Sequence, residues 1–220
     1  MDFNTILSLV GPSTLQTLAM VFVSTVFSVI LGLPLGILLC VTDPASGIMP
    51  KPVLYQVLTR IVNALRSFPF MILMILLFPL SRFIVGSSIG TVATMVPLSI
   101  AAAPFVARII ETSLKEVDLG VVQAARAMGS TNFQIIVKVL LPEALPSLVS
   151  GITLTIINLI GYSAMAGVIG GGGLGDLAIR YGYQRNQPLV MIPAVIIILI
   201  LVEVIQLVGS KISSNLLARR

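Results

Sequence analysis

The chain has 220 residues, of which 57% are hydrophobic and only 10% are charged, and its mean hydropathy is +1.10. Soluble domains usually carry about 25% charged residues, so this composition excludes an ordinary soluble domain and predicts an all-α protein that crosses a membrane several times. The formal net charge of +5 favours an anionic lipid bilayer as a partner over nucleic acid, because the basic residues stand between apolar runs.

A spanning helix needs about 20 apolar residues to cross about 30 Å of hydrocarbon. Five segments reach that length, at about 14–41, 61–80, 89–110, 148–169 and 189–208. Residues 1–12 precede them and are expected to form a short interfacial helix, since Phe3, Ile6, Leu7 and Val10 share one apolar face. The chain start lacks the basic region of a signal peptide, so we expect the first span to stay in the mature protein.

Lysine and arginine set the expected orientation. With the link between spans three and four in the cytoplasm, ten basic residues fall on the cytoplasmic side and three on the outer side. The cytoplasmic set is Lys51, Arg60, Arg66, Arg108, Lys115, Arg126, Lys138, Lys211, Arg219 and Arg220, and the outer set is Arg82, Arg180 and Arg185. Five spans then place the N-terminus outside and the C-terminus in the cytoplasm.

Proline and cysteine add two expectations. The spans contain Pro34, Pro69, Pro97, Pro104 and Pro193. Proline removes a backbone donor and kinks a helix, so bends are expected at these points. The sequence has no His and a single Cys, Cys40, which excludes histidine general bases, Cys/His metal sites and disulfides within the chain.

The longest link, at about 111–147, does not have the composition of a loop. Residues 116–128 include strong helix formers, and Gly129 is placed to stop that helix. Residues 132–141 indicate a second helix, which Pro142 is expected to end. The link is therefore predicted to be a pair of short helices on the cytoplasmic side.

The same link carries a spaced motif. It reads Gln123-Ala124-Ala125-Arg126-Ala127-Met128-Gly129, then nine residues, then Val139-Leu140-Leu141-Pro142. This resembles the motif of ABC importer permeases, which is Glu-Ala-Ala, three residues, Gly, nine residues and Ile-x-Leu-Pro. The spacing agrees throughout, while Gln123 replaces Glu and Val139 replaces Ile. The resemblance implies a type I ABC importer permease, one membrane domain over residues 1–220, whose coupling loop at about 111–147 docks on an ATPase.

The physical properties of the first short helix suit that role. Its alanines give a slim surface, and Leu119, Val122 and Ala125 or Arg126 recur at helical spacing to form a mixed apolar and basic face. The alternative is an ordinary amphipathic helix that lies on the membrane. The expected docking residues are Glu116, Leu119, Val122, Gln123, Ala124, Ala125, Met128, Gly129 and Pro142.

No ATP site is expected in this chain, because it lacks Gly-x-x-x-x-Gly-Lys-[Ser/Thr]. Gly170, Gly172 and Gly175 fit a dinucleotide-binding spacing, but that fingerprint requires a preceding strand. The run 170–173 is instead expected to form a tight turn on the outer side. ATP and Mg are therefore assigned to a separate subunit, and no cofactor, metal or catalytic residue is assigned here.

The chain also resembles the permeases of methionine importers. The resemblance rests on Arg66-Ser67-Phe68-Pro69-Phe70, on 161–167, and on Gly172-Gly173-Leu174-Gly175-Asp176-Leu177, and it covers nearly the whole chain. It implies a homodimer in the inner (cytoplasmic) membrane, two ATPase subunits, an extracytoplasmic binding protein, and L-methionine, with D-methionine as a further substrate. Another amino acid or a small organic solute stays open as an alternative.

Two polar features lie inside spans. Thr155, Asn158, Tyr162 and Met165 share one helical face of span four, which indicates either a translocation path or hydrogen bonds between helices. Glu203 is the clearest charged residue within a span, and it indicates an ionisable site or a partner for a basic side chain. Glu203 would also serve a standalone ion-coupled carrier. An intramembrane enzyme is disfavoured, because no acidic pair or Ser-Lys dyad stands at helical spacing in a span.

Overall fold

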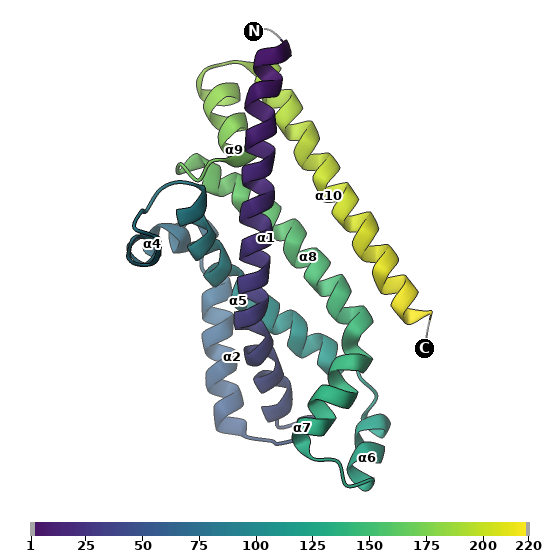
Figure 1. Ribbon diagram of the computed structural model, residues 1–220. Helices are drawn as coiled ribbons and strands as arrows, with labels where there is room; N and C mark the ends of the chain where they lie inside the picture. The colour runs from purple at the N-terminus through teal and green to yellow at the C-terminus, as the bar shows by residue number, and fades with distance from the viewer. Residues whose placement is uncertain (1–2, 219–220) are drawn as a thin grey trace. The chain divides into compact units, whose positions relative to one another are not determined.

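The computed structural model describes residues 3–218 and is helical in each of its elements (Figure 1). The helices are α1 (Phe3–Thr42), α2 (Pro52–Ser67), α3 (Phe70–Leu76), α4 (Phe78–Val85), α5 (Thr91–Lys115), α6 (Leu119–Ala127), α7 (Asn132–Ile135), α8 (Leu141–Val168), α9 (Gly173–Asp176) and α10 (Pro188–Leu217). Two π-helical segments, η1 (Ile136–Leu140) and η2 (Leu177–Gln184), precede α8 and α10. The all-α class is thus confirmed for the described residues.

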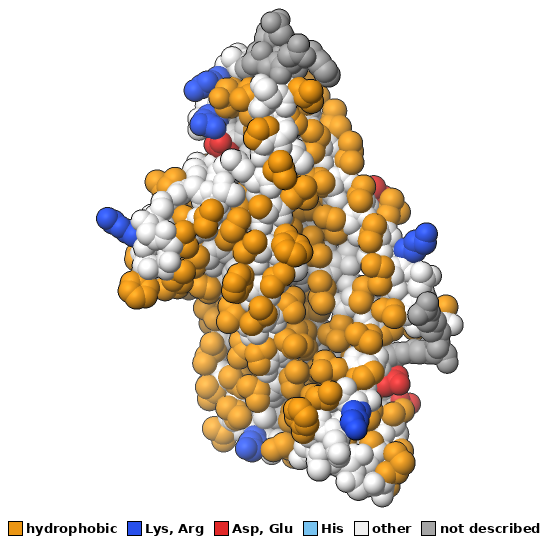
Figure 2. Space-filling model, in the orientation of Figure 1, with side chains coloured by type: hydrophobic (Ala, Val, Ile, Leu, Met, Phe, Trp, Pro, Cys, Tyr) orange, Lys and Arg blue, Asp and Glu red, His pale blue; other side chains and the backbone are white. Residues whose placement is uncertain are grey.

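Four helical segments are long and apolar enough to cross a membrane, namely Ile6–Thr42, Thr91–Lys115, Asn132–Val168 and Pro188–Leu217. The bent pair Pro52–Ser67 and Phe70–Leu76 supplies a fifth if it is counted as one span. Hydrophobic side chains cover most of the face in Figure 2, as lipid contact requires. The expectation of five spans is confirmed on that count.

The second span differs from the expected continuous helix over 61–80. Helix α2 ends at Ser67, and α3 begins after Pro69, whose extended backbone (φ −58°, ψ 124°) makes it the N-cap. Proline disfavours the helical conformation of the residue before it, so the chain leaves the helix at Phe68. By contrast, α5 continues through Pro97 and Pro104.

The separate interfacial helix expected over residues 1–12 is wrong for the part that is described. Helix α1 runs without a break from Phe3 to Thr42, and Met1 and Asp2 lie outside the described residues. Val10 is buried in a cluster with Leu174 and Val190. This burial stabilises the first turns as part of the long helix, which continues through Gly11 and Pro12.

The chain divides into two compact units, to which the long helices contribute different segments. Unit 1 comprises Met1–Ser28, Phe68–Ala102 and Thr155–Gln206. Two apolar clusters fill it, one around Met20, Leu98 and Leu159 and the other around Leu174 and Val190. Unit 2 comprises Val29–Ser67, Ala103–Leu154 and Leu207–Arg220, and one cluster around Val106, Ile110, Leu114, Ile135 and Leu140 fills it.

The prediction that Pro142 ends a helix is also wrong. The helical run continues from Asn132 to Val168 through η1, where the Leu141 amide donates to the Ile136 carbonyl, five residues back. A π turn widens the helix locally, and such turns accommodate disturbances of the hydrogen-bond ladder. The helix therefore passes Pro142 with its core side chain Leu140 still buried.

Candidate functional site

Helix α6, in unit 2, has a defined beginning and end. The Asp118 carboxylate caps its N-terminus by accepting from the Gly120 amide at 2.6 Å. At its C-terminus Gly129 has φ +81°, and the amides of Gly129 and Ser130 donate to the carbonyls of Arg126 and Ala125. These two bonds form a Schellman motif, which needs a left-handed residue that glycine supplies without strain. The prediction that Gly129 stops the helix is confirmed.

Helix α7 follows two residues after Gly129 and lies beside α6 (Figure 1). A capping box opens it, in which the Thr131 hydroxyl accepts from the Gln134 amide and the Gln134 side chain accepts from the Thr131 amide. Each exchange satisfies a free amide at the helix start. We call α6, the turn at Gly129 and α7 the coupling hairpin (residues 119–135).

The structure divides the face that was expected for docking. Val122 and Ala125 are buried in the unit 2 cluster with Ile48 and Leu140, whereas Leu119 is 54% exposed. The expected mixed face of Leu119, Val122 and Ala125 or Arg126 is therefore split, with Leu119 and Arg126 exposed and Val122 and Ala125 buried. Helical spacing identified the stripe, but Val122 and Ala125 face inward because the chain's own loop at Ile48 covers them.

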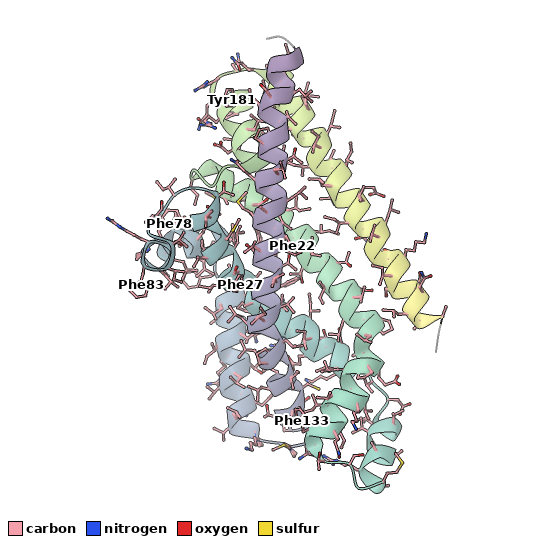
Figure 3. All side chains as sticks on the ribbon, viewed as in Figure 1. Phe22, Phe27, Phe78, Phe83, Phe133 and Tyr181 are labelled. Carbon is pink, nitrogen blue, oxygen red and sulfur yellow. The ribbon has the colours of Figure 1, made fainter. Side chains whose placement is uncertain are left out.

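The coupling hairpin carries several exposed apolar side chains. Met128 is 80% exposed, Phe133, labelled in Figure 3, is 74% exposed, and Leu119 and Val121 are exposed as well. Phe133 was missed by the motif, although a large apolar residue two positions after the Thr131 cap is a signal that could have found it. Exposed apolar patches outside the spans mark contact sites. The other expected docking residues Glu116, Gln123, Ala124, Gly129 and Pro142 are also exposed.

Glu116 directly follows α5, in the short connection that leads into α6. Its carboxylate accepts from the Ser147 hydroxyl at 2.6 Å, and Ser147 also contacts Ser113 at 3.1 Å. These residues line an open groove of about 470 Å³ with Asp118 and Glu143. Glu116 therefore connects α5 to α8 as well as being exposed.

An ionic cluster lies beside the coupling hairpin within unit 2, and the sequence did not predict it. Glu111 is 1% exposed and accepts from Arg108 at 2.6 Å, from Lys115 at 2.7 Å and from the Tyr55 hydroxyl at 3.1 Å. Arg108 also donates to Asn63 at 2.8 Å, so the cluster joins α5 to α2. A buried carboxylate is stable only when it is paired in this way.

Lys115 extends the cluster to the loop after α1, where it pairs with Asp43 at 2.8 Å. Burial alone would raise the pKa of Asp43, but hydrogen bonds from Lys115, the Ala45 amide and the Ser46 hydroxyl outweigh it and hold that pKa below its ordinary value. The Arg126 guanidinium donates to the carbonyl of Ile48 in the same loop. The loop at 43–48 therefore contacts both the ionic cluster and α6.

The four residues expected along a translocation path do not have one environment. All four lie on α8 in unit 1, where Thr155 is buried, Asn158 is half-buried and Met165 is 46% exposed. Tyr162 stacks on Phe70, with ring centroids 4.2 Å apart. Met165 and Asn158 are accessible in this structure, whereas Thr155 packs inside the unit and does not line an open surface.

Glu203 lies on α10 and is exposed, without an ion pair or hydrogen bond to any residue between 3 and 218. The basic partner expected for Glu203 is therefore not found in that part of the chain. Glu111, by contrast, is a buried acidic residue, and it stands one residue beyond the expected third span, in the stretch assigned to the link.

The glycine run after α8 forms the tight turn that was expected. Gly170, Gly172 and Gly173 all have positive φ, and the Gly173 and Leu174 amides donate to the side chains of Gln16 and Thr17, each at 2.9 Å. The helix α8, and not a strand, precedes this turn. The spacing therefore does not belong to a dinucleotide-binding βαβ unit.

Comparison with known proteins identifies the family. Residues 28–212 match the family described as binding-protein-dependent transport system inner membrane component. The chain belongs to this family. It is accordingly a multi-pass inner membrane protein and a transport permease subunit.

Individual relatives agree with this family assignment. The chain is 49% identical to a probable D-methionine transport system permease protein MetI of Pasteurella multocida, over 94% of this chain and 95% of the relative. It is 46% identical to the protein of the same description from Vibrio cholerae, over 96% and 97%. Both relatives match nearly end to end, so the likeness includes the spans and the coupling hairpin.

Solved structures agree on the fold. An inward facing structure of the MetNI methionine ABC transporter matches with a TM-score of 0.95 at 46% identity, over 98% of this chain and 99% of that chain. An amino acid ABC transporter solved with histidines matches with a TM-score of 0.72 at 24% identity, over 100% and 99%, which shows the fold alone. The fold of this family member is that of a type I ABC importer permease.

Proposed function

We propose that this chain is the permease subunit of an ATP-driven importer that carries methionine, as the L-form and the D-form, across the inner membrane. The transporter would contain two copies of this chain, two copies of a cytoplasmic ATP-binding subunit and an extracytoplasmic substrate-binding protein. Support comes from relatives named D-methionine permeases and from a solved methionine ABC transporter at 46% identity.

The observation that carries the proposal is the coupling hairpin. Its outward apolar side chains Met128 and Phe133 fit a groove on a partner protein, and its inward side chains Val122 and Ala125 pack into unit 2. A short helix capped at both ends is rigid enough to move as one piece. Displacement of α6 by a partner would therefore be transmitted to the core of unit 2 rather than absorbed locally.

The chemistry of ATP hydrolysis belongs to the partner in this proposal. The partner would bind ATP and Mg, and this chain would contribute no cofactor site. Its task is to form the path and to change shape when the partner pushes α6. Asn158, Tyr162 and Met165 are the candidates along the path, and Thr155 would reach it only if unit 1 rearranges.

The topology completes the proposal. The excess of basic residues places the coupling hairpin and the C-terminus in the cytoplasm and the N-terminus outside, as the positive-inside rule requires. Arg219 and Arg220, which contribute to that excess, lie outside the described residues. The chain would work as one membrane domain whose link at 111–147 presents the hairpin to the ATPase.

A docking experiment tests the proposal directly. Met128→Asp and Phe133→Ser in the complex co-expressed with the ATPase should lower ATPase co-purification and methionine uptake at least about tenfold, since truncating a central apolar contact costs about 1–2 kcal/mol or more. Phe83→Ser, at a residue that is 87% exposed on α4 in unit 1, is the matched control and should retain assembly. Full assembly and uptake in both hairpin variants would refute the docking role.

A substrate experiment separates the alternatives. Uptake of labelled L-methionine by proteoliposomes holding the complete transporter should be ATP-dependent, and unlabelled D-methionine should compete. Competition only by another amino acid or small solute would keep the permease role and change the substrate. Uptake by the chain without an ATPase, lost in Glu203→Gln, would instead establish a standalone ion-coupled carrier.

A further inference from the structure

We propose that Glu111 is a positioning residue for coupling, which fixes the loop 43–48 against α5 so that the loop holds α6 in place. The inference rests on the proposed function and deepens it, because it names the residues that would pass motion from the coupling hairpin into the spans. It concerns contacts within unit 2 alone.

The first step is the environment of Glu111. Its side chain is 1% exposed and receives three donors, from Arg108 and Lys115 on its own helix and from Tyr55 on α2. Two acceptors, Asp43 and Glu111, thus face two cations, and the cluster is balanced in charge. A carboxylate with three fixed donors in a buried site has one low-energy geometry, so it sets the position of every group that contacts it.

The second step is continuity with the coupling hairpin. Lys115 bridges Glu111 at 2.7 Å and Asp43 at 2.8 Å. Asp43 in turn holds the Ala45 amide at 3.1 Å and the Ser46 hydroxyl at 3.0 Å. Ile48 follows in the same loop, and its carbonyl accepts a hydrogen bond from Arg126 of α6. A chain of polar contacts therefore runs from α6 through the loop to α5 and α2.

The loop 43–48 is rigid, so it can pass a displacement of α6 on to Asp43. The Gly47 amide donates to the Asp43 carbonyl at 2.9 Å, and the Met49 amide donates to the Val41 carbonyl at 2.9 Å. A Cβ at Gly47 would meet the backbone of Val41 and Asp43, so the turn is closely packed. Motion of α6 that pulls on Ile48 would therefore move Asp43 with it.

The third step concerns why unit 2 contains an ionic cluster in addition to the apolar packing of α6. The apolar cluster of Ile48, Val122 and Ala125 already packs α6 onto the loop. A buried ion pair adds little net stability, and such pairs are best explained where they specify one geometry among several similar packings. The structure therefore assigns to the ionic cluster the alignment of α6 and the loop 43–48, while the apolar contacts stabilise their packing.

A double-mutant cycle tests this assignment on the complete transporter in proteoliposomes. The readout is methionine transported per ATP hydrolysed, which a loss of folded protein alone would not change. Glu111→Gln and Arg126→Gln should each lower this ratio about fivefold, within the range found for residues along coupled networks. The double variant should be no worse than the worse single variant, because both break the same chain of contacts.

The control is Arg180→Gln, which removes an exposed ion pair with Asp176 in unit 1 at 2.7 Å. Alone it should leave the ratio unchanged, and combined with Glu111→Gln it should add nothing beyond the single effect. If Glu111→Gln fails to assemble, Asp43→Asn breaks the same chain from the loop and should give the same fivefold loss, again without addition to Arg126→Gln.

Two results would overturn the proposal. One is a fully additive effect of the Glu111 and Arg126 substitutions, which would mean that they act independently. The other is an unchanged ratio with uptake and ATP hydrolysis falling together, which would mean a purely structural role. Failure of the unaltered complex to show ATP-dependent methionine uptake is a different result, since it removes the proposed function itself before any variant is compared.

Discussion

Unit 1 and unit 2 use different chemistry to join segments that are distant in the sequence. In unit 1 the contacts are neutral, as when Ser24 donates to the Met95 carbonyl or the Leu174 amide donates to Thr17. In unit 2 an ionic cluster centred on Glu111 joins α5, α2 and the loop after α1. Separating buried charges costs more than exchanging one neutral hydrogen bond for another, so unit 2 is the harder of the two to deform.

The charge of the chain follows the same division. Among residues 3–218, unit 2 contains eight basic and five acidic residues, and unit 1 contains three basic and two acidic residues. Within this range unit 2 therefore has a net charge of +3 and unit 1 a net charge of +1. The eight basic residues of unit 2 in this range all belong to the set that the positive-inside rule assigns to the cytoplasm. The division found in the packing thus agrees with the orientation that the sequence predicts.

The largest predicted difference between the units concerns their central polar groups. Glu111→Gln should lower the free energy of unfolding by about 3 kcal/mol, because it leaves Arg108 without a carboxylate partner and Lys115 with Asp43 alone. Ser24→Ala, its counterpart in unit 1, should cost about 0.5–1 kcal/mol. Thermal unfolding of the purified transporter measures both. Equal losses would contradict the contrast between the two units.

Close helix packing should not distinguish the units. A Cβ at Gly36 in unit 2 would lie 2.6 Å from the Ala107 carbonyl oxygen, and one at Gly175 in unit 1 would meet the backbone of Ala164. Gly36→Ala and Gly175→Ala should each cost about 1–3 kcal/mol through overpacking. Gly161→Ala is the control, because nothing lies within 4 Å of its added Cβ, and it should leave the unfolding midpoint unchanged or slightly higher. A loss in only one unit would extend the contrast from charge to packing.

Smaller losses of unfolding free energy, equal in the two units, are expected for substitutions at the two helix ends closed by glycine. Gly129 ends α6 in unit 2 with φ +81°, and Gly86 ends α4 in unit 1 with φ +82°. Gly129→Ala and Gly86→Ala should each cost about 1 kcal/mol, the ordinary penalty for a Cβ in the left-handed region. Unfolding midpoints of the two variants test this. A much larger loss of unfolding free energy for Gly129→Ala would mean that the substitution disturbs contacts of the coupling hairpin beyond the turn at Gly129.

The smallest effect is the pH dependence of the loop at 43–48. The pKa of Asp43 is lowered in the folded chain, so its contribution to stability is complete above the ordinary carboxyl pKa and is lost as the pH falls through the lowered value. The protection factors of the Gly47 and Met49 amides, which compare the measured exchange rate with that of an unfolded chain at the same pH, should therefore fall in acid. Asp43→Asn should show low protection of these amides at every pH. Protection factors that do not change with pH in the unaltered protein would remove Asp43 from the network.

Local signals in the sequence predicted several features correctly. The apolar runs predicted five spans because lipid requires about 20 apolar residues in each helix. The stop at Gly129 was predictable because only glycine readily takes the left-handed conformation that closes a helix in this way. The spacing from Gln123 to Pro142 predicted the family, because the order and separation of the motif residues can be read directly along the chain. Each of these signals depends on residues close together in the sequence.

The features that escaped prediction depend on distant residues. Val122 and Ala125 turn inward because Ile48, far earlier in the chain, covers them. Glu111 is buried because Tyr55 and Asp43 approach it from other segments. Pro69 breaks its helix whereas Pro97 does not, although both are prolines within apolar runs. Periodicity identifies a stripe on a helix, but tertiary packing decides which way that stripe faces.

The burial of Cys40 has a practical consequence for following the transport cycle. Cys40 is the one cysteine of the chain and is only 6% exposed, within the apolar cluster of unit 2. Maleimide reagents need an accessible thiolate, so a buried thiol reacts slowly. A fluorophore could therefore be attached at Asn132→Cys, an exposed position of the coupling hairpin outside the expected docking residues, while the native thiol stays in place. Site-specific labelling therefore does not require removal of the native cysteine, and the movement of the coupling hairpin could be followed by fluorescence during ATP turnover.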